Sequence, residues 1–150
     1  MHTLKFDILI QAPRSLVWAT MLEPHSYAQW TSAFCAGSQV EGEWQTGHPL
    51  RFSNGQGCGL VAEVAELRLH EWLSIRHLGV IVDGVEDTHS EAVRAWAPCY
   101  ENYQFSDANG ATRLQISQDC LADYEAMLAE CWPRALQLLK TLCEQRHQEG

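Results

Sequence analysis

The chain has 150 residues, 46% of them hydrophobic, and its 10 basic and 19 acidic residues give a net charge of -9. This length suits one domain, spanning residues 1–150, with a core large enough to fold without a metal or disulfide. The acidic balance disfavours binding to nucleic acid or to an anionic membrane surface, because both present negative phosphates. We expect no membrane span, because the apolar runs fall far short of roughly 18 residues. The N-terminus shows no secretory signal, so we expect a cytoplasmic protein.

Cysteine and histidine spacing gives no support for a metal or a disulfide framework. The six cysteines are Cys35, Cys58, Cys99, Cys120, Cys131 and Cys143. Free thiols are expected in a cytoplasmic chain with an adequate core. Cys143 and His147 are spaced one helical turn apart, but two ligands make an incomplete site. No glycine-rich phosphate loop or nucleophile-elbow motif is present. We therefore predict no metal and no cofactor.

The first thirty residues predict one strand followed by two short helices. Apolar and polar residues alternate over 3–11, which is typical of a half-buried strand. Pro13 suits the first turn of a helix, and apolar residues continue at helical spacing up to Pro24. A second short helix is expected over His25–Trp30, separated from the first by that proline.

The middle of the chain predicts antiparallel strands and one long loop. The expected strands are 38–44, 48–54, 57–67, 71–78, 99–106 and 111–118. Asn54-Gly55 supplies the positive φ angles of a tight hairpin, and residues 107–110 should form another turn. Residues 79–97 predict a long solvated loop with a helical turn around Ala92–Trp96. Long loops often act as lids, so Trp96 either reaches a ligand or anchors the loop to the core.

The last thirty residues predict a long amphipathic helix. Its apolar stripe is expected to be Tyr124, Leu128, Cys131, Ala135, Leu138 and Leu142. Pro133 should kink the helix near Ala129–Trp132. One long helix facing a many-stranded antiparallel sheet predicts an α+β two-layer domain.

Several segments, in this order along the chain, carry a resemblance to a known superfamily. They are Ile10–Trp18, Glu41–Gly47, Gly59–Val64, Glu101–Tyr103 and Trp132–Leu136. Together they resemble the SRPBCC (START-like, birch-pollen-allergen-like) superfamily, in the branch related to activators of the heat-shock chaperone ATPase. The resemblance implies a helix-grip fold: a curved antiparallel sheet of about six to seven strands around a long C-terminal helix, with two short helices after strand 1.

The same resemblance implies several kinds of function and no common catalytic motif. Members of the superfamily often hold a lipid, sterol, polyketide or other apolar ligand between sheet and helix. Others are cyclases, dehydratases or co-chaperone domains, and the fold does not choose between them. We therefore assign no catalytic residue from the resemblance.

A ligand cavity is expected between the inner strand faces and the helix stripe. Its candidate residues are Trp44, Phe52, Leu73, Ile75, His77, Trp96, Glu101, Tyr103, Phe105, Tyr124, Met127, Leu128 and Cys131. Such sites are mostly apolar with a few placed polar groups. The alternative is that these side chains simply fill the core.

Two carboxylates are predicted to face inward by the period of two along a strand. Glu101 shares a face with Tyr103 and Phe105, and the same rule directs Glu63 inward. His77 should lie on a neighbouring strand, where a Glu101–His77 pair could bind a polar ligand head or act as acid and base. The alternative is that both carboxylates meet solvent or an arginine such as Arg76.

Three functions remain open on the sequence. The leading hypothesis is a binding protein for a small apolar or amphipathic molecule. The second is a cofactor-free enzyme that uses the same cavity. The third is a chaperone-associated interaction protein, which would need an exposed docking patch.

Overall fold

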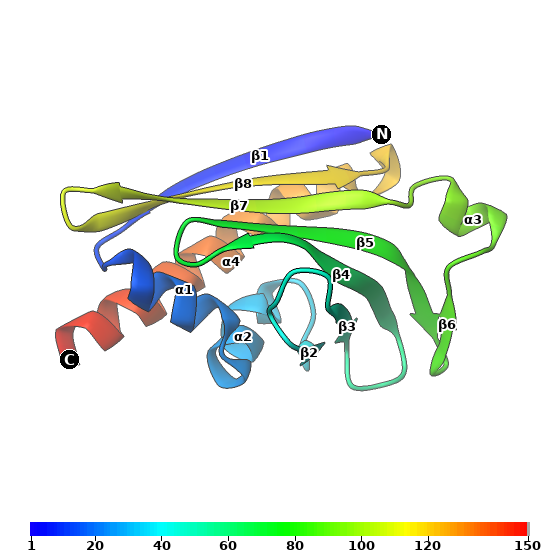
Figure 1. Ribbon diagram of the computed structural model, residues 1–150, viewed down its shortest axis with the longest axis horizontal. Helices are drawn as coiled ribbons and strands as arrows, with labels where there is room; N and C mark the ends of the chain where they lie inside the picture. Colours follow the sequence, from blue (N-terminus) through cyan, green and yellow to red (C-terminus); the bar gives the residue numbers. More distant parts are fainter. Residues whose placement is uncertain (150) are drawn as a thin grey trace.

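The computed structural model describes residues 1–149, within which eight strands and a long C-terminal helix dominate (Figure 1). The strands are β1 (His2–Ile10), β2 (Gln39–Gly42), β3 (Pro49–Ser53), β4 (Gly59–Arg68), β5 (Trp72–Val82), β6 (Val85–Asp87), β7 (Cys99–Ala108) and β8 (Ala111–Cys120). The helices are α1 (Arg14–Leu22), α2 (Pro24–Trp30), the 3-10 turn η1 (Thr31–Ala33), α3 (Glu91–Arg94) and α4 (Ala122–Glu149).

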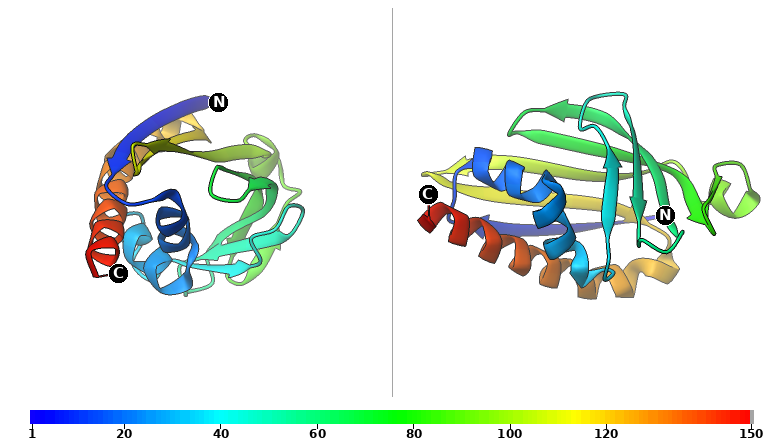
Figure 2. Two further views of the ribbon diagram at one scale, coloured as in Figure 1. Left: turned by 60° about the vertical axis from the view of Figure 1, so that its left-hand side comes forward. Right: turned by 90° about the horizontal axis from the view of Figure 1, so that it is seen from below.

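All strands belong to one antiparallel sheet that curls around the helices. The strand order is β1-β8-β7-β5-β4-β3-β2, and β6 pairs with the end of β5. Figure 2 shows the sheet bent into an open wall, with α4 along its open side and α1 and α2 at one end. This arrangement confirms the α+β helix-grip fold, with eight strands rather than six to seven.

Alternating side chains explain why β1 and β8 pair in the observed register. Phe6 of β1 lies opposite Ile116 of β8, and Ile8 lies opposite Leu114, so apolar side chains share the concave face. The β7–β8 turn is made by Asn109 and Gly110, whose φ angles of 56° and 89° fit the tight hairpin predicted there.

The segment 79–97 contains more regular structure than the sequence indicated. The prediction of a continuous loop was wrong, because β5 extends to Val82 and turns back into β6. Gly79 permits this pairing, since a Cβ there would lie 2.1 Å from the carbonyl oxygen of Asp87. The helical turn expected near Ala92 is α3, whose backbone N–H at Val93 is capped by the Ser90 hydroxyl.

The buried face of α4 differs from the predicted stripe. The buried residues are Leu128, Trp132, Ala135, Leu136, Leu139 and Cys143. Tyr124 and Leu138, which the stripe included, are 55% and 41% exposed. The buried face of α4 is therefore shifted by about one residue from the predicted stripe, and this shift places the Trp132 indole at the centre of the core. Pro133 lies inside α4 without ending it.

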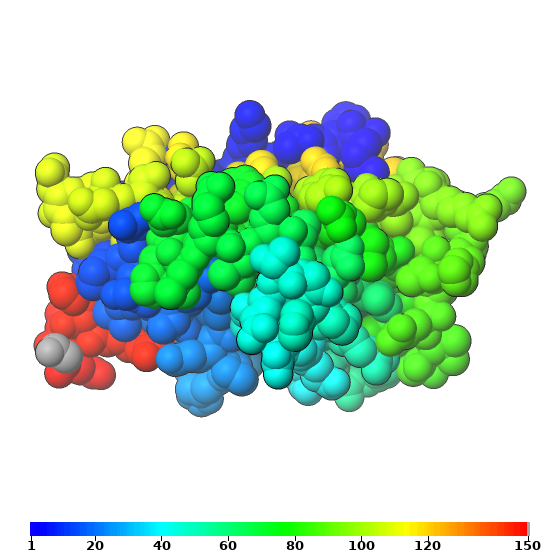
Figure 3. All heavy atoms as spheres, viewed as in Figure 1, coloured from blue at the N-terminus to red at the C-terminus, as the bar shows by residue number. Residues whose placement is uncertain are grey.

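The outer surface closes around this core. In the space-filling view, atoms of α1 and α2 (blue), of the β2–β3 region (cyan) and of β4 and β5 (green) lie side by side (Figure 3). Within residues 1–149, no helix combines the length and the apolar character that crossing a bilayer requires.

Candidate ligand-binding site

The concave side of the sheet encloses two adjoining chambers. The inner chamber, of about 200 Å³, lies between the sheet, α2, η1 and α4. The outer chamber, of about 300 Å³, lies where the ends of β5, β7 and β8 meet the first turns of α4. Leu60, His77, Gln118 and Leu128 line both chambers. We refer to these four residues as the waist of the cavity.

Apolar and aromatic side chains make most of the walls. The inner chamber is completed by Met21, Leu22, Tyr27, Trp30, Thr31, Phe34, Ser38, Trp44, Phe52, Leu73, Ile75, Glu101, Tyr103 and Trp132. The outer chamber is completed by Val80, Trp96, Cys99, Asp119, Cys120, Leu121, Tyr124 and Met127. Neither set contains lysine or arginine, so among the described lining residues the cavity has no permanent positive charge.

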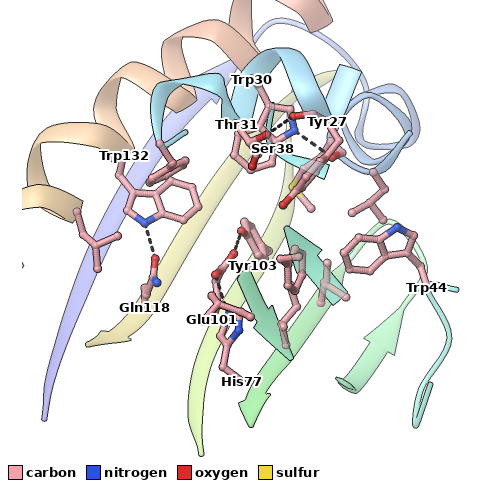
Figure 4. Close-up of a pocket in the computed structure, with 18 residues that line it drawn as sticks. Tyr27, Trp30, Thr31, Ser38, Trp44, His77, Glu101, Tyr103, Gln118 and Trp132 are labelled. Carbon is pink, nitrogen blue, oxygen red and sulfur yellow. Dashed lines mark hydrogen bonds and ion pairs between the residues drawn. The ribbon is translucent and has the colours of Figure 1, made fainter. Parts of the chain in front are cut away.

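Three polar side chains meet beside the waist: His77, Glu101 and Tyr103. The β5–β7 register sets Leu73 opposite Tyr103 and Ile75 opposite Glu101, which brings the next inward residue of β5, His77, next to Glu101. The Nε2 of His77 lies 3.1 Å from Oε1 of Glu101, and the Tyr103 hydroxyl donates to Oε2 (Figure 4). The predicted Glu101–His77 pair is therefore present in the structure, with Tyr103 as a third member.

Burial and charge fix the protonation of two tyrosines near this carboxylate. Burial, and then the negative charge of Glu101, raises the pKa of Tyr103 well above its ordinary value. The same two causes, in the same order, raise the pKa of Tyr27. Both phenols stay protonated near neutral pH, so Tyr103 keeps the hydrogen that it donates to Glu101, and Tyr27 is a hydrogen-bond donor lining the inner chamber.

One polar atom of this cluster has no partner. The His77 side chain is 4% exposed, and its Nδ1 makes no hydrogen bond to any residue from 1 to 149. Buried polar atoms without partners are uncommon, because each costs desolvation free energy. His77 lines both chambers, but Nδ1 is itself fully buried, so the ring faces the cavity through its other atoms.

Trp132 organises the wall opposite the sheet. Its ring centroid lies 4.9 Å from that of Phe34, 5.8 Å from Phe6 and 6.1 Å from Trp30. Its Nε1 donates to Oε1 of Gln118 at 2.6 Å, a bond drawn in Figure 4. This polar link holds a waist residue in place, so the aromatic core and the cavity are built from the same side chains.

Most of the predicted cavity residues line one of the chambers. Trp44, Phe52, Leu73, Ile75, His77, Glu101, Tyr103 and Leu128 line the inner chamber, and Trp96, Tyr124 and Met127 line the outer one. The prediction that Phe105 and Cys131 line the cavity is corrected, since neither lines a chamber. Phe105 instead packs on Trp18, with ring centroids 5.1 Å apart, and Cys131 lies to the side of the buried face of α4.

The inward placement of Glu63 was also wrong. Ala62 and Val64 are the buried residues of this part of β4, so strict alternation turns Glu63, which lies between them, to the convex face. Glu63 pairs on the convex face with Arg76, whose Nε donates to the Tyr100 hydroxyl at 3.0 Å. The arginine alternative therefore holds for Glu63, whereas Glu101 faces the cavity.

Sequence reasoning missed the contribution of α2 and η1. Tyr27, Trp30 and Phe34 line the inner chamber from the helical end, at spacings of three and four. That spacing was a visible signal for one apolar face, but nothing in this short helix, which begins at Pro24, indicated which part of the molecule that face contacts.

The described residues offer no metal site. No three histidine, cysteine, aspartate or glutamate side chains gather within residues 1–149. Cys143 is buried while His147 is exposed, so this spaced pair does not converge. The cavity can hold an apolar molecule, offer it hydrogen bonds and, through the His77–Glu101 pair, exchange a proton with it.

Comparisons with known proteins agree with this architecture. Residues 11–144 match the family model described as activator of Hsp90 ATPase homolog 1-like protein. No curated protein matches the sequence.

Solved structures share the fold at low identity. Protein MLL2253 from Mesorhizobium loti is 17% identical, with a TM-score of 0.75 over 96% of this chain and 98% of that one. DynU16, from the dynemicin biosynthetic locus, is 20% identical, with a TM-score of 0.71 over 97% of this chain and 48% of that one. The Aha1 dimer from Colwellia psychrerythraea is 15% identical, with a TM-score of 0.71 over 93% and 94%.

Proposed function

We propose that this chain, which belongs to the activator of Hsp90 ATPase homolog 1-like family, binds a small apolar or amphipathic molecule in its two-chamber cavity. The observation that carries the proposal is the lining: mostly apolar and aromatic walls with a few polar groups, among them the His77–Glu101–Tyr103 cluster. Ligand sites of soluble proteins have this composition.

Physical chemistry explains why such a cavity favours an apolar ligand. Each Å² of apolar surface that a ligand moves out of water contributes roughly 25 cal/mol. The His77–Glu101–Tyr103 cluster then adds orientation, because it offers hydrogen bonds to a polar group of the ligand at a fixed point of the wall. The walls supply affinity, and the cluster supplies specificity.

The test is binding of an environment-sensitive apolar dye, N-phenyl-1-naphthylamine, followed by fluorescence. We expect saturable binding to the wild-type protein, and weakened binding to Ser38→Trp, whose new ring would occupy the inner chamber. Ser53→Trp is the matched control, since Ser53 is also half-buried but lines neither chamber. Equal dye binding by both variants, or none by the wild type, would contradict the proposal.

A second candidate function is acid–base catalysis on the bound molecule. The observation in its favour is the buried His77–Glu101 pair, which can accept and return a proton beside a ligand. Native mass spectrometry, followed by denaturation and analysis of the released molecule, identifies the ligand. Incubating that ligand with wild type and Glu101→Gln then separates the two functions, since only catalysis changes the ligand mass or isomer.

A chaperone partner is the third candidate. The family description names activators of the Hsp90 ATPase, and one solved relative is an Aha1 dimer. Stimulation of an Hsp90 ATPase by this chain, retained in Ser38→Trp, would favour an interaction surface outside the cavity.

A further inference from the structure

We propose that the molecule bound in the inner chamber is a protonated amine with an apolar group, and that its ammonium is held by the Glu101 carboxylate. This inference rests on the proposed binding function and specifies the class of ligand. Its basis is a buried carboxylate that lacks a permanent cationic partner and lies in a chamber walled by aromatic rings.

The Glu101 carboxylate is largely removed from water without a permanent counter-charge. Its side chain is 17% exposed, and within residues 1–149 the only ion-pair partner in reach is the His77 ring. Among the described residues that line the inner chamber, Glu101 is the only aspartate, glutamate, lysine or arginine. Buried charges are ordinarily paired with an opposite charge, because removing a lone charge from water is costly. The inner chamber therefore favours a ligand that brings positive charge.

The His77 ring does not supply that positive charge. A protonated ring carries an N–H at both nitrogens, and Nδ1 is fully buried with no acceptor among residues 1–149. Burying a charged donor without a partner costs more than burying a neutral nitrogen. The favoured state is therefore the neutral ring, which keeps its hydrogen on Nε2 and donates it to Oε1 of Glu101 at 3.1 Å. With Tyr103 protonated, the three-residue cluster carries one negative charge.

The carboxylate keeps hydrogen-bonding capacity that a ligand can use. An ionised carboxylate offers about four acceptor sites. Oε1 accepts from His77 and Oε2 accepts from the Tyr103 hydroxyl, so about two sites remain. The Glu101 side chain also retains exposed surface and lines the chamber, whereas Nδ1 of His77 is out of reach. A primary ammonium, with three N–H donors and a positive charge, matches this group better than a hydroxyl does.

The rings next to this carboxylate suit a cation as well as an apolar group. The Phe52 centroid lies 5.7 Å from that of His77 and 6.3 Å from that of Tyr27, and the Trp44 centroid lies 6.4 Å from that of Phe52. Tyr27, Trp44 and Phe52 are half-buried and line the inner chamber, so part of their surface remains available to a ligand. In Figure 4, Tyr27 projects from the helical side toward the strands that carry Glu101 and His77. The faces of such rings attract cations, more strongly where water is excluded.

The unliganded fold is already prepared for this ion pair. Glu101 loses most of its water when the protein folds, so on binding only the amine has to be desolvated. The carboxylate also acts on the helical wall, because its negative charge is, after burial, the second cause that raises the pKa of Tyr27. The net charge of -9 further favours the approach of a cation over that of an anion.

The experiment compares four probes that share a phenylpropyl or equivalent group, by isothermal titration calorimetry at neutral pH. They are 3-phenylpropan-1-amine, 3-phenylpropan-1-ol, 3-phenylpropanoate and trimethyl(3-phenylpropyl)ammonium. We expect the primary amine to bind about tenfold or more tightly than the alcohol, as a charge-assisted hydrogen bond predicts. The quaternary ammonium, which keeps the charge but has no N–H, should fall between these two. The carboxylate probe should bind most weakly.

Two glutamate variants locate the charge that binds the amine. Glu101→Gln keeps the size of the side chain and should reduce the preference for the amine over the alcohol to less than about twofold, while the alcohol still binds. Glu63→Gln is the matched control, because it removes the same charge from the convex face of the sheet, where Glu63 pairs with Arg76 and lines neither chamber. It should leave the preference unchanged.

Two phenylalanine variants test the contribution of the rings. Phe52→Leu should lower the preference for the amine over the alcohol about two- to fivefold, because it removes an aromatic face and keeps an apolar side chain. Phe105→Leu is the matched control, since Phe105 also belongs to the sheet but packs on Trp18 outside both chambers. Circular dichroism melting verifies that each variant is folded, and the wild-type probe series does not depend on any variant.

The outcomes separate this inference from the proposed function. Alcohol binding as tight as amine binding in the wild type would overturn the amine assignment while apolar binding stands. An amine preference that Glu101→Gln and Glu63→Gln reduce equally would show attraction by the overall charge and would overturn the role of Glu101. If the naphthylamine dye and all four probes fail to bind, the proposed function itself is refuted, and this inference with it.

Discussion

Replacing Trp132 by alanine should be one of the most destabilising single substitutions in α4. The indole is 2% exposed, contacts rings from β1, α2 and β7, and donates a hydrogen bond to Gln118. Truncating a buried aromatic side chain to alanine costs about 3–5 kcal/mol, and the lost hydrogen bond adds about 1 kcal/mol. Since 1 kcal/mol corresponds to about 2–4 °C at this chain length, we expect Tm to fall by about 8–24 °C.

The assay is urea and thermal unfolding followed by far-ultraviolet circular dichroism, which does not depend on the number of tryptophans. Trp72→Ala is the matched control, because Trp72 lies half-buried on the sheet with Arg68 over its ring. It should cost about 1 kcal/mol or less. Trp132→Phe, which keeps a ring but removes the N–H, should fall between the two. A Trp132→Ala variant as stable as Trp72→Ala would refute the view that this indole organises the core.

Three further perturbations test other parts of the structure. With a thiol reagent such as DTNB, the exposed Cys35 and Cys58 should react fastest. Burial raises the pKa of Cys99 to about 12, so its thiol should be protected. Fast labelling that remains after both Cys35 and Cys58 are replaced by serine would contradict the burial pattern. Glu144→Gln should cost about 0.5–1 kcal/mol at pH 7 in urea unfolding. The Lys140 ammonium and the backbone N–H of Gln11 hold the pKa of Glu144 below its ordinary value. The contribution of Glu144 to stability is therefore full above the ordinary pKa and is lost as pH falls through the lowered pKa. A free-energy difference between Glu144→Gln and wild type that stays the same in acid would be inconsistent with this linkage. Gly59→Ala should destabilise by about 2 kcal/mol or more, because the added Cβ would lie 1.8 Å from a carbonyl oxygen of β3; near-wild-type unfolding would argue against this close approach.

The architecture could be predicted because the hydrophobic period changes at clear boundaries. Alternation over β1 and over the β7–β8 hairpin, and helical spacing after residue 122, each reflect a local rule. The rules failed where tertiary contacts decide the outcome. Residues 79–97 read as polar loop, yet Gly79 allows β6 to pair closely with β5, and nothing local indicates that partner.

The candidate site shows the same division in two glutamates. Glu101 and Glu63 were both directed inward by the period of two. In β7 the concave face carries Tyr103, so Glu101 reaches the cavity, whereas in β4 it carries Ala62 and Val64, so Glu63 faces Arg76 on the convex side. Alternation shows which residues of a strand share a face, but Val61 and Ala65 are apolar like Ala62 and Val64, so this strand read alone does not reveal which face is the inner one.

The helix face was misjudged by one position for a comparable reason. Leu128, Ala135 and Leu142 fit a stripe that passes through Cys131, but Leu128, Trp132 and Leu139 fit an equally regular one. The aromatic rings of Trp30 in α2, of Phe34 just after η1 and of Phe6 in β1 select the second stripe, because a buried indole has far more contact area to gain than a cysteine. Periodicity shows that a helix has a buried face, and packing against the rest of the protein determines which residues form that face.

The partnerless nitrogen of His77 connects the stability of this fold to its proposed function. Leaving a buried polar atom unpaired costs about 1–3 kcal/mol, a large fraction of the roughly 5–15 kcal/mol that stabilises a domain. A side chain of the same size without that nitrogen would avoid the cost, but it would also lose the contact that Nε2 makes with the Glu101 carboxylate at 3.1 Å. Because Nδ1 is fully buried, a ligand in the cavity does not recover this free energy and instead stabilises the fold by covering the apolar walls. The cost of the unpaired nitrogen is therefore the cost of holding a polar cluster inside an apolar cavity, which is the feature on which the proposed binding function depends.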